Sequence, residues 1–252
     1  VADLELERRR ELGIVQLVVR HHLPARACRQ GARCGGVVLV VIGRRTVDRQ
    51  QQPASWIGEG FDLGVGSIER RYVSCAEDTK DGANNTDTTL TGDLCWRTDN
   101  AVMSLNGNST ELVWDKDKAT WRSRNEDGSK IEQVNKWTGS EYWKVTGTDG
   151  TEYYFGRESL PGHTSTTDSA WKVPVYGNHK NEPCNKPAFA ESECSLIYRW
   201  NLDYVVDVYG NTQSYWYAKE NNFYGTRVTA TAKREYTRGG TLKRIDYGTW
   251  DR

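Results

Sequence analysis

The first 52 residues of this 252-residue chain lack lysine, phenylalanine, tyrosine and tryptophan, so every aromatic residue lies in residues 53–252. The same segment holds ten arginines against five acidic residues, and an acidic excess in the remainder balances it. Two interpretations of residues 1–52 stay open. Either they form a small folded unit, with a helix over residues 1–19 and a buried strand in residues 35–43, or they are an out-of-frame translation of GC-rich DNA.

Long apolar runs and a surplus of charge are also missing. No stretch approaches the ~20 apolar residues of a membrane-spanning helix, so we expect no such span. The formal net charge is +0, whereas a general nucleic-acid binder needs a basic excess, so we expect no nucleic-acid partner. The chain has only one methionine and six prolines but ten tryptophans, thirteen tyrosines and 24 glycines, a composition that favours β-structure over a helical bundle.

Residues 53–252 alternate between β-prone runs and short turns. Asn106-Gly107-Asn108 separates residues 101–105 from 109–115, and Asn-Gly is a strong signal for a tight hairpin. Four more hairpins are predicted in the same way, because glycine, asparagine and aspartate tolerate a positive φ. Their paired runs are 118–124 with 129–134, 141–147 with 151–156, 197–210 with 211–220, and 226–237 with 241–248. The predicted fold class is all-β, as consecutive antiparallel β-hairpins, and either a degenerate repeat array or an ordinary sandwich or barrel fits the pattern.

Two polar, strand-poor segments, residues 75–95 and 157–194, interrupt the predicted hairpins, and cysteines bracket all or part of each. These are Cys75 and Cys95 in the first, and Cys184 and Cys194 in the second. Such local pairs suit disulfides that staple loops in an exported protein. Four cysteines permit three pairings, and of these we predict the two local ones. A metal site needs closer spacing than this, so we expect no metal and no other cofactor, although His179 can be drawn together with two of the cysteines.

Several strings resemble the RHS/YD-repeat proteins. Residues 53–72 resemble the segment that opens the β-shell of that family, a Gly-x-Gly-aromatic turn followed by an apolar run that ends in Ile-x-Arg. Residues 199–217 resemble the family's repeat core, in which an aspartate precedes a Gly-Asn turn and aromatic residues follow. The matching residues are Gly58, Gly60, Phe61, Gly66, Ile68 and Arg70 in the first string, and Asp207, Gly210, Asn211 and Tyr215 in the second. With the paired cysteines, residues 53–252 look most like exported RHS-repeat proteins of actinobacteria.

The resemblance implies a function. Residues 53–252 would form an arc of an RHS/YD-repeat shell, a non-enzymatic wall without catalytic residues, preceded by a segment of uncertain assignment. In the family such shells enclose a C-terminal toxin domain, as in polymorphic toxins and toxin-complex cocoon proteins, and relatives act in cell-surface adhesion. The expected partners are the remainder of the same shell and an enclosed toxin domain, and the expected location is secreted or at the cell surface. The expected repeat-turn residues are Asp127, Gly128, Asp149, Gly150, Asp207, Gly210 and Asn211.

An alternative from a different class is an extracellular carbohydrate-binding β-domain that stacks a cell-surface glycan on exposed Trp and Tyr residues. The possible stacking residues are Trp121, Trp143, Trp171 and Trp216, and the competing interpretation is that they pack between hairpins. Two other kinds of site are weakly indicated. His163, Ser165 and Asp168 can be drawn as a triad but lack a Gly-x-Ser-x-Gly elbow. The acidic loop around residues 77–87 lacks the ligand spacing of a known calcium loop.

Overall fold

The computed structural model describes residues 3–8, 15–20, 39–42, 65–85, 92–228 and 231–250, and divides the chain into two compact units, residues 1–65 and 66–252. The first unit contains an antiparallel sheet of order β1-β2-β3, formed by Asp3–Arg8, Val15–Arg20 and Leu39–Ile42. A helix over residues 1–19 is therefore wrong. Leucine alternates with charged residues in β1, which is the period of a strand, and β-branched valines dominate β2. The strand expected in residues 35–43 is present as β3.

The second unit is all-β, and its described residues contain no α-helix, only short 3-10 turns. Its strands are β4 (Ser67–Glu69), β5 (Val73–Ser74), β6 (Leu94–Cys95), β7 (Ala101–Leu105), β8 (Asn108–Asp115), β9 (Thr120–Ser123), β10 (Lys130–Val134), β11 (Tyr142–Thr146), β12 (Glu152–Phe155), β13 (Ala170–Tyr176), β14 (Glu193–Val206), β15 (Asn211–Gly225) and β16 (Lys233–Trp250). The 3-10 turns are η1 (Cys75–Glu77), η3 (Phe189–Glu191) and η4 (Thr226–Val228). No helix in the described part of the chain is long and apolar enough to cross a membrane.

Four of the five predicted hairpins are present as antiparallel pairs, namely β7–β8, β9–β10, β11–β12 and β14–β15. The tightest turn has the predicted Asn-Gly chemistry, with positive φ angles at Asn106 (52°) and Gly107 (78°). The predicted hairpin around residues 238–240 is wrong, because β16 runs straight through these residues. The connection from β15 to β16 lies earlier in the chain, where the amide of Thr226 donates to the carbonyl of Ala232 at 3.0 Å.

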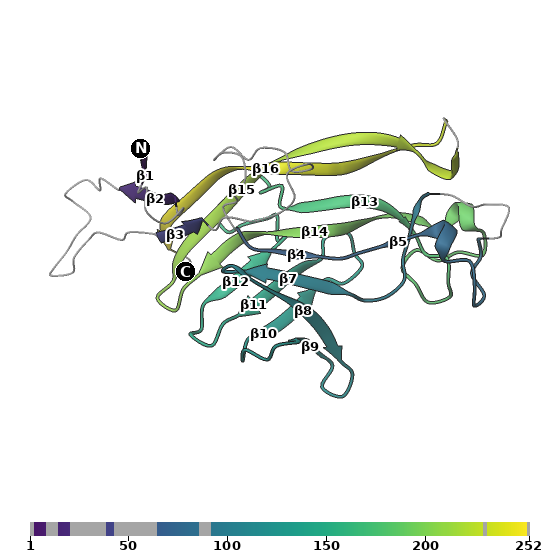
Figure 1. Ribbon diagram of the computed structural model, residues 1–252, viewed down its shortest axis with the longest axis horizontal. Helices are drawn as coiled ribbons and strands as arrows, with labels where there is room; N and C mark the ends of the chain where they lie inside the picture. The colour runs from purple at the N-terminus through teal and green to yellow at the C-terminus, as the bar shows by residue number, and fades with distance from the viewer. Residues whose placement is uncertain are drawn as a thin grey trace. The chain divides into compact units, whose positions relative to one another are not determined.

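The strands β4, β7, β8, β9, β10, β11, β12 and β14 close into a ring, in that order of pairing. Two hydrogen bonds show that β14 uses both edges to close it. The amide of Leu202 donates to the carbonyl of Gly66 beside β4, whereas the carbonyl of Asn201 accepts from the amide of Gly156 after β12. Figure 1 shows β14 running alongside β4 and β13, with β7 to β12 gathered on one side of the unit.

Side chains fill the interior of this ring, as expected for a closed sheet of about eight strands. Trp114, Trp121, Trp143 and Trp200 stand on four different strands and form a row of edge-to-face contacts, with ring centroids 5.6, 5.1 and 5.9 Å apart. Trp143 and Trp200 are completely buried. The indoles share the core with Ile68, Met103, Leu112, Ile131 and Phe155. The row begins near solvent, because Trp114 is 40% exposed.

One ion pair lies inside this core. Nη1 of Arg70 is 3.3 Å from Oε1 of Glu141, and both side chains are almost completely buried. The guanidinium also lies over the rings of Trp96 and Trp200, at 4.8 and 5.1 Å from their centroids. Such cation–π contacts strengthen when the cation is removed from water. Arg70 thus joins β4, the β11 end of the ring and the indole row.

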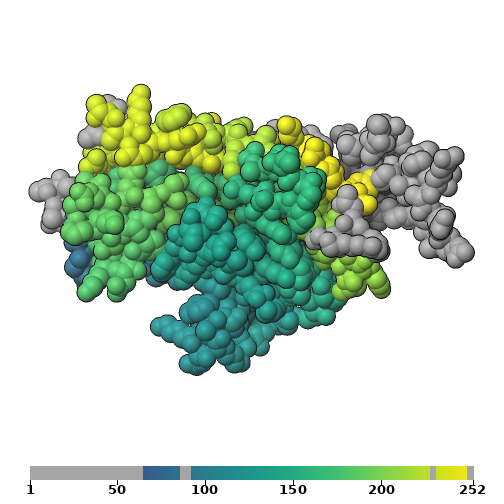
Figure 2. All heavy atoms as spheres, turned by 180° about the vertical axis from the view of Figure 1, so that it is seen from behind, coloured from purple at the N-terminus to yellow at the C-terminus, as the bar shows by residue number. Residues whose placement is uncertain are grey.

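A second layer covers part of β13 and β14. It is the long ribbon of β15 and β16, which pair from Asn211↔Trp250 to Gly225↔Lys233. Figure 1 shows this ribbon lying along β13, and Figure 2 shows its side chains as a yellow-green band on one side of the second unit. Tyr198 Oη on β14 donates to the carbonyl of Thr237 at 3.0 Å. A Cβ at Gly240 would lie 2.6 Å from the carbonyl oxygen of Ala218 and 2.9 Å from the indole of Trp171, so this glycine permits close layer contact.

Candidate functional site

The four cysteines of the second unit lie in one cluster, in which the two bridged loops contact each other. Cys75 is joined to Cys95 and Cys184 to Cys194, with Cα atoms 4.9 and 5.9 Å apart. The first disulfide is buried against Tyr176 and Phe189, which stacks on Tyr176 with centroids 4.5 Å apart. Phe189 lies between the second pair of cysteines in the sequence, so the hydrophobic contact ties the two bridged loops together.

Side-chain amides fasten the same two loops to each other. Nδ2 of Asn84 donates to Oγ of Ser192 at 2.9 Å, and Nδ2 of Asn178 donates to Oδ1 of Asn85 at 3.1 Å. His179 lies here as well, with Nδ1 3.4 Å from Oε1 of Glu182. Burial raises the pKa of Glu182. The described residues hold no cluster of three His, Cys, Asp or Glu side chains arranged for a metal ion, and the amides of this acidic loop act as hydrogen-bond donors. Residues 86–91 lie outside the described part.

The predicted repeat-turn residues lie at hairpin turns and share one geometry. Oδ1 of Asp149 accepts from the amide of Thr151 at 3.0 Å, and Oδ1 of Asp207 accepts from the amides of Tyr209 and Asn211 at 2.8 and 2.9 Å. Oδ1 of Asp127 likewise accepts from the amide of Ser129 at 3.0 Å. The side chains of Ser129 and Asn211 also donate to Asp127 and Asp207. These side-chain hydrogen bonds, and the amide hydrogen bonds at all three turns, favour the charged carboxylate and lower the pKa of the three aspartates. The glycines Gly128, Gly150 and Gly210 have φ angles of 76°, 83° and 83°.

The expected sugar-stacking tryptophans are buried, which corrects that expectation. Trp121 and Trp143 stand in the indole row inside the ring, with exposed fractions of 3% and 0%. Trp171 is 8% exposed and is covered by the β15–β16 ribbon, and Trp216 is 6% exposed. Their faces are taken by protein contacts, because hairpins that have few aliphatic side chains use indoles to fill their interior. With at most 8% of each residue exposed, none of the four forms an exposed platform for a sugar ring.

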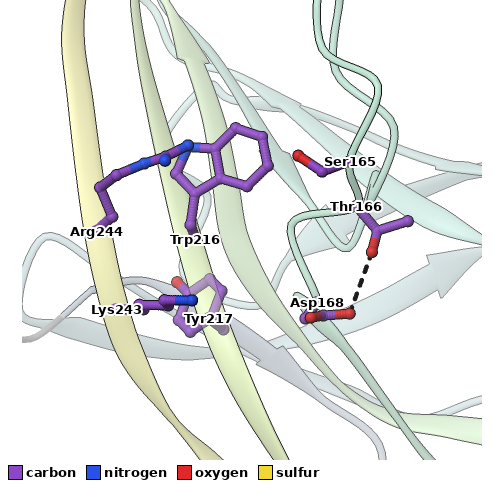
Figure 3. A pocket seen from close by; sticks show the side chains of 7 residues that line it. All are labelled: Ser165, Thr166, Asp168, Trp216, Tyr217, Lys243 and Arg244. Atoms are coloured by element: carbon purple, nitrogen blue, oxygen red, sulfur yellow. Dashed lines mark hydrogen bonds between the residues drawn. The ribbon is translucent and has the colours of Figure 1, made fainter.

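A small pocket lies between the segment before β13 and the β15–β16 ribbon. Figure 3 shows Ser165, Thr166 and Asp168 facing Trp216, Tyr217, Lys243 and Arg244 across it. The Arg244 guanidinium lies 4.6 Å from the centroid of the Trp216 ring. Oδ1 of Asp168 accepts from Oγ1 of Thr166 at 3.2 Å.

The triad drawn from the sequence does not assemble in this pocket. The ring of His163 stands edge-on to Trp216, with centroids 4.9 Å apart. Among the hydrogen bonds of the described residues, none joins His163 to Ser165 or to Asp168. A nucleophile needs its base within hydrogen-bond reach, and the structure provides no such pair here.

A buried polar cluster around Asp203 was not among the sites predicted from the sequence. Asp203 on β14 is completely buried, and its Oδ2 accepts from Oγ1 of Thr167 (2.8 Å), Oγ of Ser169 (2.7 Å) and the amide of Glu158 (2.8 Å). Burial raises the pKa of Asp203 to about 6, although these hydrogen bonds oppose the shift. The cluster fixes the segment between β12 and β13 to β14. Alternation along β14 places Asp203 with Asn201 on the polar face, opposite Leu202 and Tyr204, so the sequence does not indicate that Asp203 is buried, and its hydroxyl partners are distant in sequence.

The raised pKa of Asp203 predicts a pH dependence of stability. A carboxyl whose pKa is higher in the folded state stabilises the fold when protonated, and this contribution is lost as pH rises from about 4 through about 6. We expect the free energy of unfolding, measured with urea, to fall over that range by at most about 3 kcal/mol more in the natural chain than in D203N. Parallel pH profiles for the two proteins would contradict this expectation.

No protein-family model and no curated protein matches the sequence. Solved structures that are similar in part include the following three. A chain of the Tc holotoxin pore of Photorhabdus luminescens is 19% identical with a TM-score of 0.37, over 98% of this chain and 10% of that one. The N-terminal domain of the effector protein SpvB of Salmonella typhimurium is 15% identical with a TM-score of 0.41, over 86% and 61%. A chain of TcdB2-TccC3 is 18% identical with a TM-score of 0.36, over 97% and 10%.

This chain therefore spans about a tenth of two of these proteins and about three fifths of the third. With TM-scores below 0.5 and identities below 20%, these similarities establish neither a family nor a function for it.

Proposed function

We propose that residues 66–252 are a structural, non-enzymatic wall module of an RHS/YD-type shell. The shell would enclose or present a C-terminal effector in an exported toxin or cell-surface protein. In this role the module acts mechanically, by closing backbone hydrogen bonds into a continuous sheet and by presenting a strand edge to which further sheet is added.

The observation that carries the proposal is that the strands of the ring are paired along both edges, whereas β16 is paired along one. The ring of β4, β7–β12 and β14 satisfies both edges of its strands. In contrast, β16 is 18 residues long and, within the described part of the chain, pairs with β15 alone. A long edge strand presents unpaired backbone groups to which another strand can add. The sheet is therefore suited to extension at β16.

Two other features support the proposal. Disulfides persist in oxidising compartments, so the two bridges agree with an exported protein. Rigid packing of the ring interior, with Trp143 and Trp200 fully buried, suits a part that bears load rather than one that opens around a substrate.

Sedimentation velocity of the full 252-residue chain over a range of concentrations tests the open edge. We expect self-association through β16, because among the described residues only β15 pairs with it. Proline removes a backbone donor. Of two neighbouring strand residues, one amide faces β15 and the other faces outward. We therefore compare I245P with D246P. The variant that loses the outward amide should lose self-association with little loss of stability, and the variant that loses the amide facing β15 should be destabilised.

The two variants serve as controls for each other, because both carry the same substitution on the same strand. A chain that stays monomeric at every concentration contradicts the proposal. So does self-association that neither proline reduces.

A further inference from the structure

Two exposed indoles lie near one mouth of the ring. Trp114 on β8 is 40% exposed, and Trp137 in the β10–β11 turn is 43% exposed. Val113 is 49% exposed as well, but its side chain lies on the opposite face of β8 from Trp114. A cluster of this kind marks a binding surface more often than scattered single residues do.

The two indoles are held in place rather than left loose. Nζ of Lys136 lies 4.5 Å from the ring centroid of Trp137 and 5.9 Å from that of Trp114, and 2.6 Å from Oδ2 of Asp99. Trp114 also rests edge-on against buried Trp121. The lysine therefore fixes the spacing of two solvent-facing rings before any ligand arrives, which lowers the entropy that binding costs.

The backbone at Trp137 is strained in a way that the core maintains. Its φ angle is 64°, a region that large side chains rarely adopt. Oε2 of buried Glu141 accepts from the Trp137 amide at 3.0 Å, and the same carboxylate is paired with Arg70. Strain of this kind persists only where the surroundings enforce it, and it is found more often at binding sites than elsewhere.

A groove of about 610 Å³ adjoins Trp114, and its walls carry hydrogen-bonding groups of both signs. Asp99 and Glu111 supply acceptors, and Arg71 and Lys116 supply donors. Paired acceptors and donors beside aromatic faces match a sugar, whose ring presents C–H groups on its face and hydroxyls around its edge. The groove has the size of a small-molecule site.

The strand pairing argues against a peptide in this groove. A peptide that adds to a sheet needs a free strand edge, but β7 pairs with both β4 and β8, and β8 pairs with both β7 and β9. The acidic side chains in the groove also disfavour a nucleic acid. A ligand in this groove would therefore be bound by the faces of the indole rings and by the charged groups of the side chains.

We propose that Trp114, Lys136 and Trp137, with the adjoining groove, bind an uncharged linear oligosaccharide. This site differs from the buried tryptophans that the sequence suggested, and it does not depend on the wall function, because it lies on the ring mouth and not on β16.

Titration of the full-length chain with soluble cellulose and chitin oligosaccharides, followed by tryptophan fluorescence and calorimetry, tests the proposal. We expect saturable binding of at least one of the two, weakened about tenfold or more in W114A and in W137A. F223A is the matched control, because Phe223 is also an exposed aromatic residue, 60% exposed on β15, and its loss should leave binding unchanged.

W114F and W137F keep an aromatic face and should retain part of the affinity, which separates stacking from a loss of folding. Absence of binding to both oligosaccharides overturns the proposal, as does equal binding by W137A and the natural chain. If W114A and W137A abolish self-association instead, a second copy of the chain occupies the site and the proposal is likewise overturned.

Discussion

Replacing Arg70 with methionine is expected to lower the free energy of unfolding by about 3–5 kcal/mol, since it leaves the carboxylate of Glu141 buried without its cation. The loss has a second source, because the guanidinium also contacts Trp96 and Trp200. Urea denaturation of the full-length chain measures the effect, and the slope with denaturant should stay unchanged if the fold is kept.

An exposed ion pair provides the control for R70M. Nη1 of Arg124 is 2.6 Å from Oε2 of Glu111, but the two side chains are 70% and 56% exposed. R124M should therefore cost no more than about 1 kcal/mol. The double variant R70M/E141L should recover part of the loss, because it removes both buried charges together. Equal destabilisation by R70M and R124M would show that burial does not set the strength of the inner pair.

Replacing Trp143 with alanine is expected to cost about 3–5 kcal/mol, because it empties the middle of the indole row. Trp143 is fully buried and touches both Trp121 and Trp200 edge to face. W114A removes the same side chain from the exposed end of the row and should cost much less. A thermal or urea transition gives both values, and similar losses would mean that the row is not the centre of the core.

The two large effects should not add in a combined variant. Arg70 and Trp143 both contact Trp200, so removal of one relaxes the surroundings of the other. A double-mutant cycle with R70M and W143A measures this coupling directly.

Local turn chemistry made four of the hairpins predictable. Asn106-Gly107 and Asp149-Gly150 encode their turns within four residues, through positive φ and through aspartate acceptors for turn amides. Gly239-Gly240 carries the same signal for a different reason, since Gly240 makes room for the indole of Trp171. The sequence alone does not show whether a glycine is needed for a turn or for close packing against another side chain, because the packing partner is distant in sequence.

The rest depends on contacts between distant residues. Strand β13 lies inside residues 157–194, a segment whose polar composition predicts few strands, yet residues 170–176 are paired with β14. The burial of Trp171 follows from the ribbon that covers it. The raised pKa of Asp203 follows from its burial, and its three hydrogen-bond partners, which oppose the shift, lie at least 34 residues away. The sequence around Trp114 and Trp137 does not distinguish them from the buried tryptophans. They are exposed because they lie at an end of the strand ring.

Closure of the ring on β14 also affects how the chain emerges from the ribosome. β4 pairs with residues 199–201 of β14, which are synthesised about 130 residues after β4. The other seven strands of the ring therefore cannot close into a ring until β14 has been made. Until then β4 and β12 are two bare margins of an incomplete sheet, and contacts of such long range form slowly. Nascent chains stalled before residue 193 should therefore be the form most in need of a chaperone.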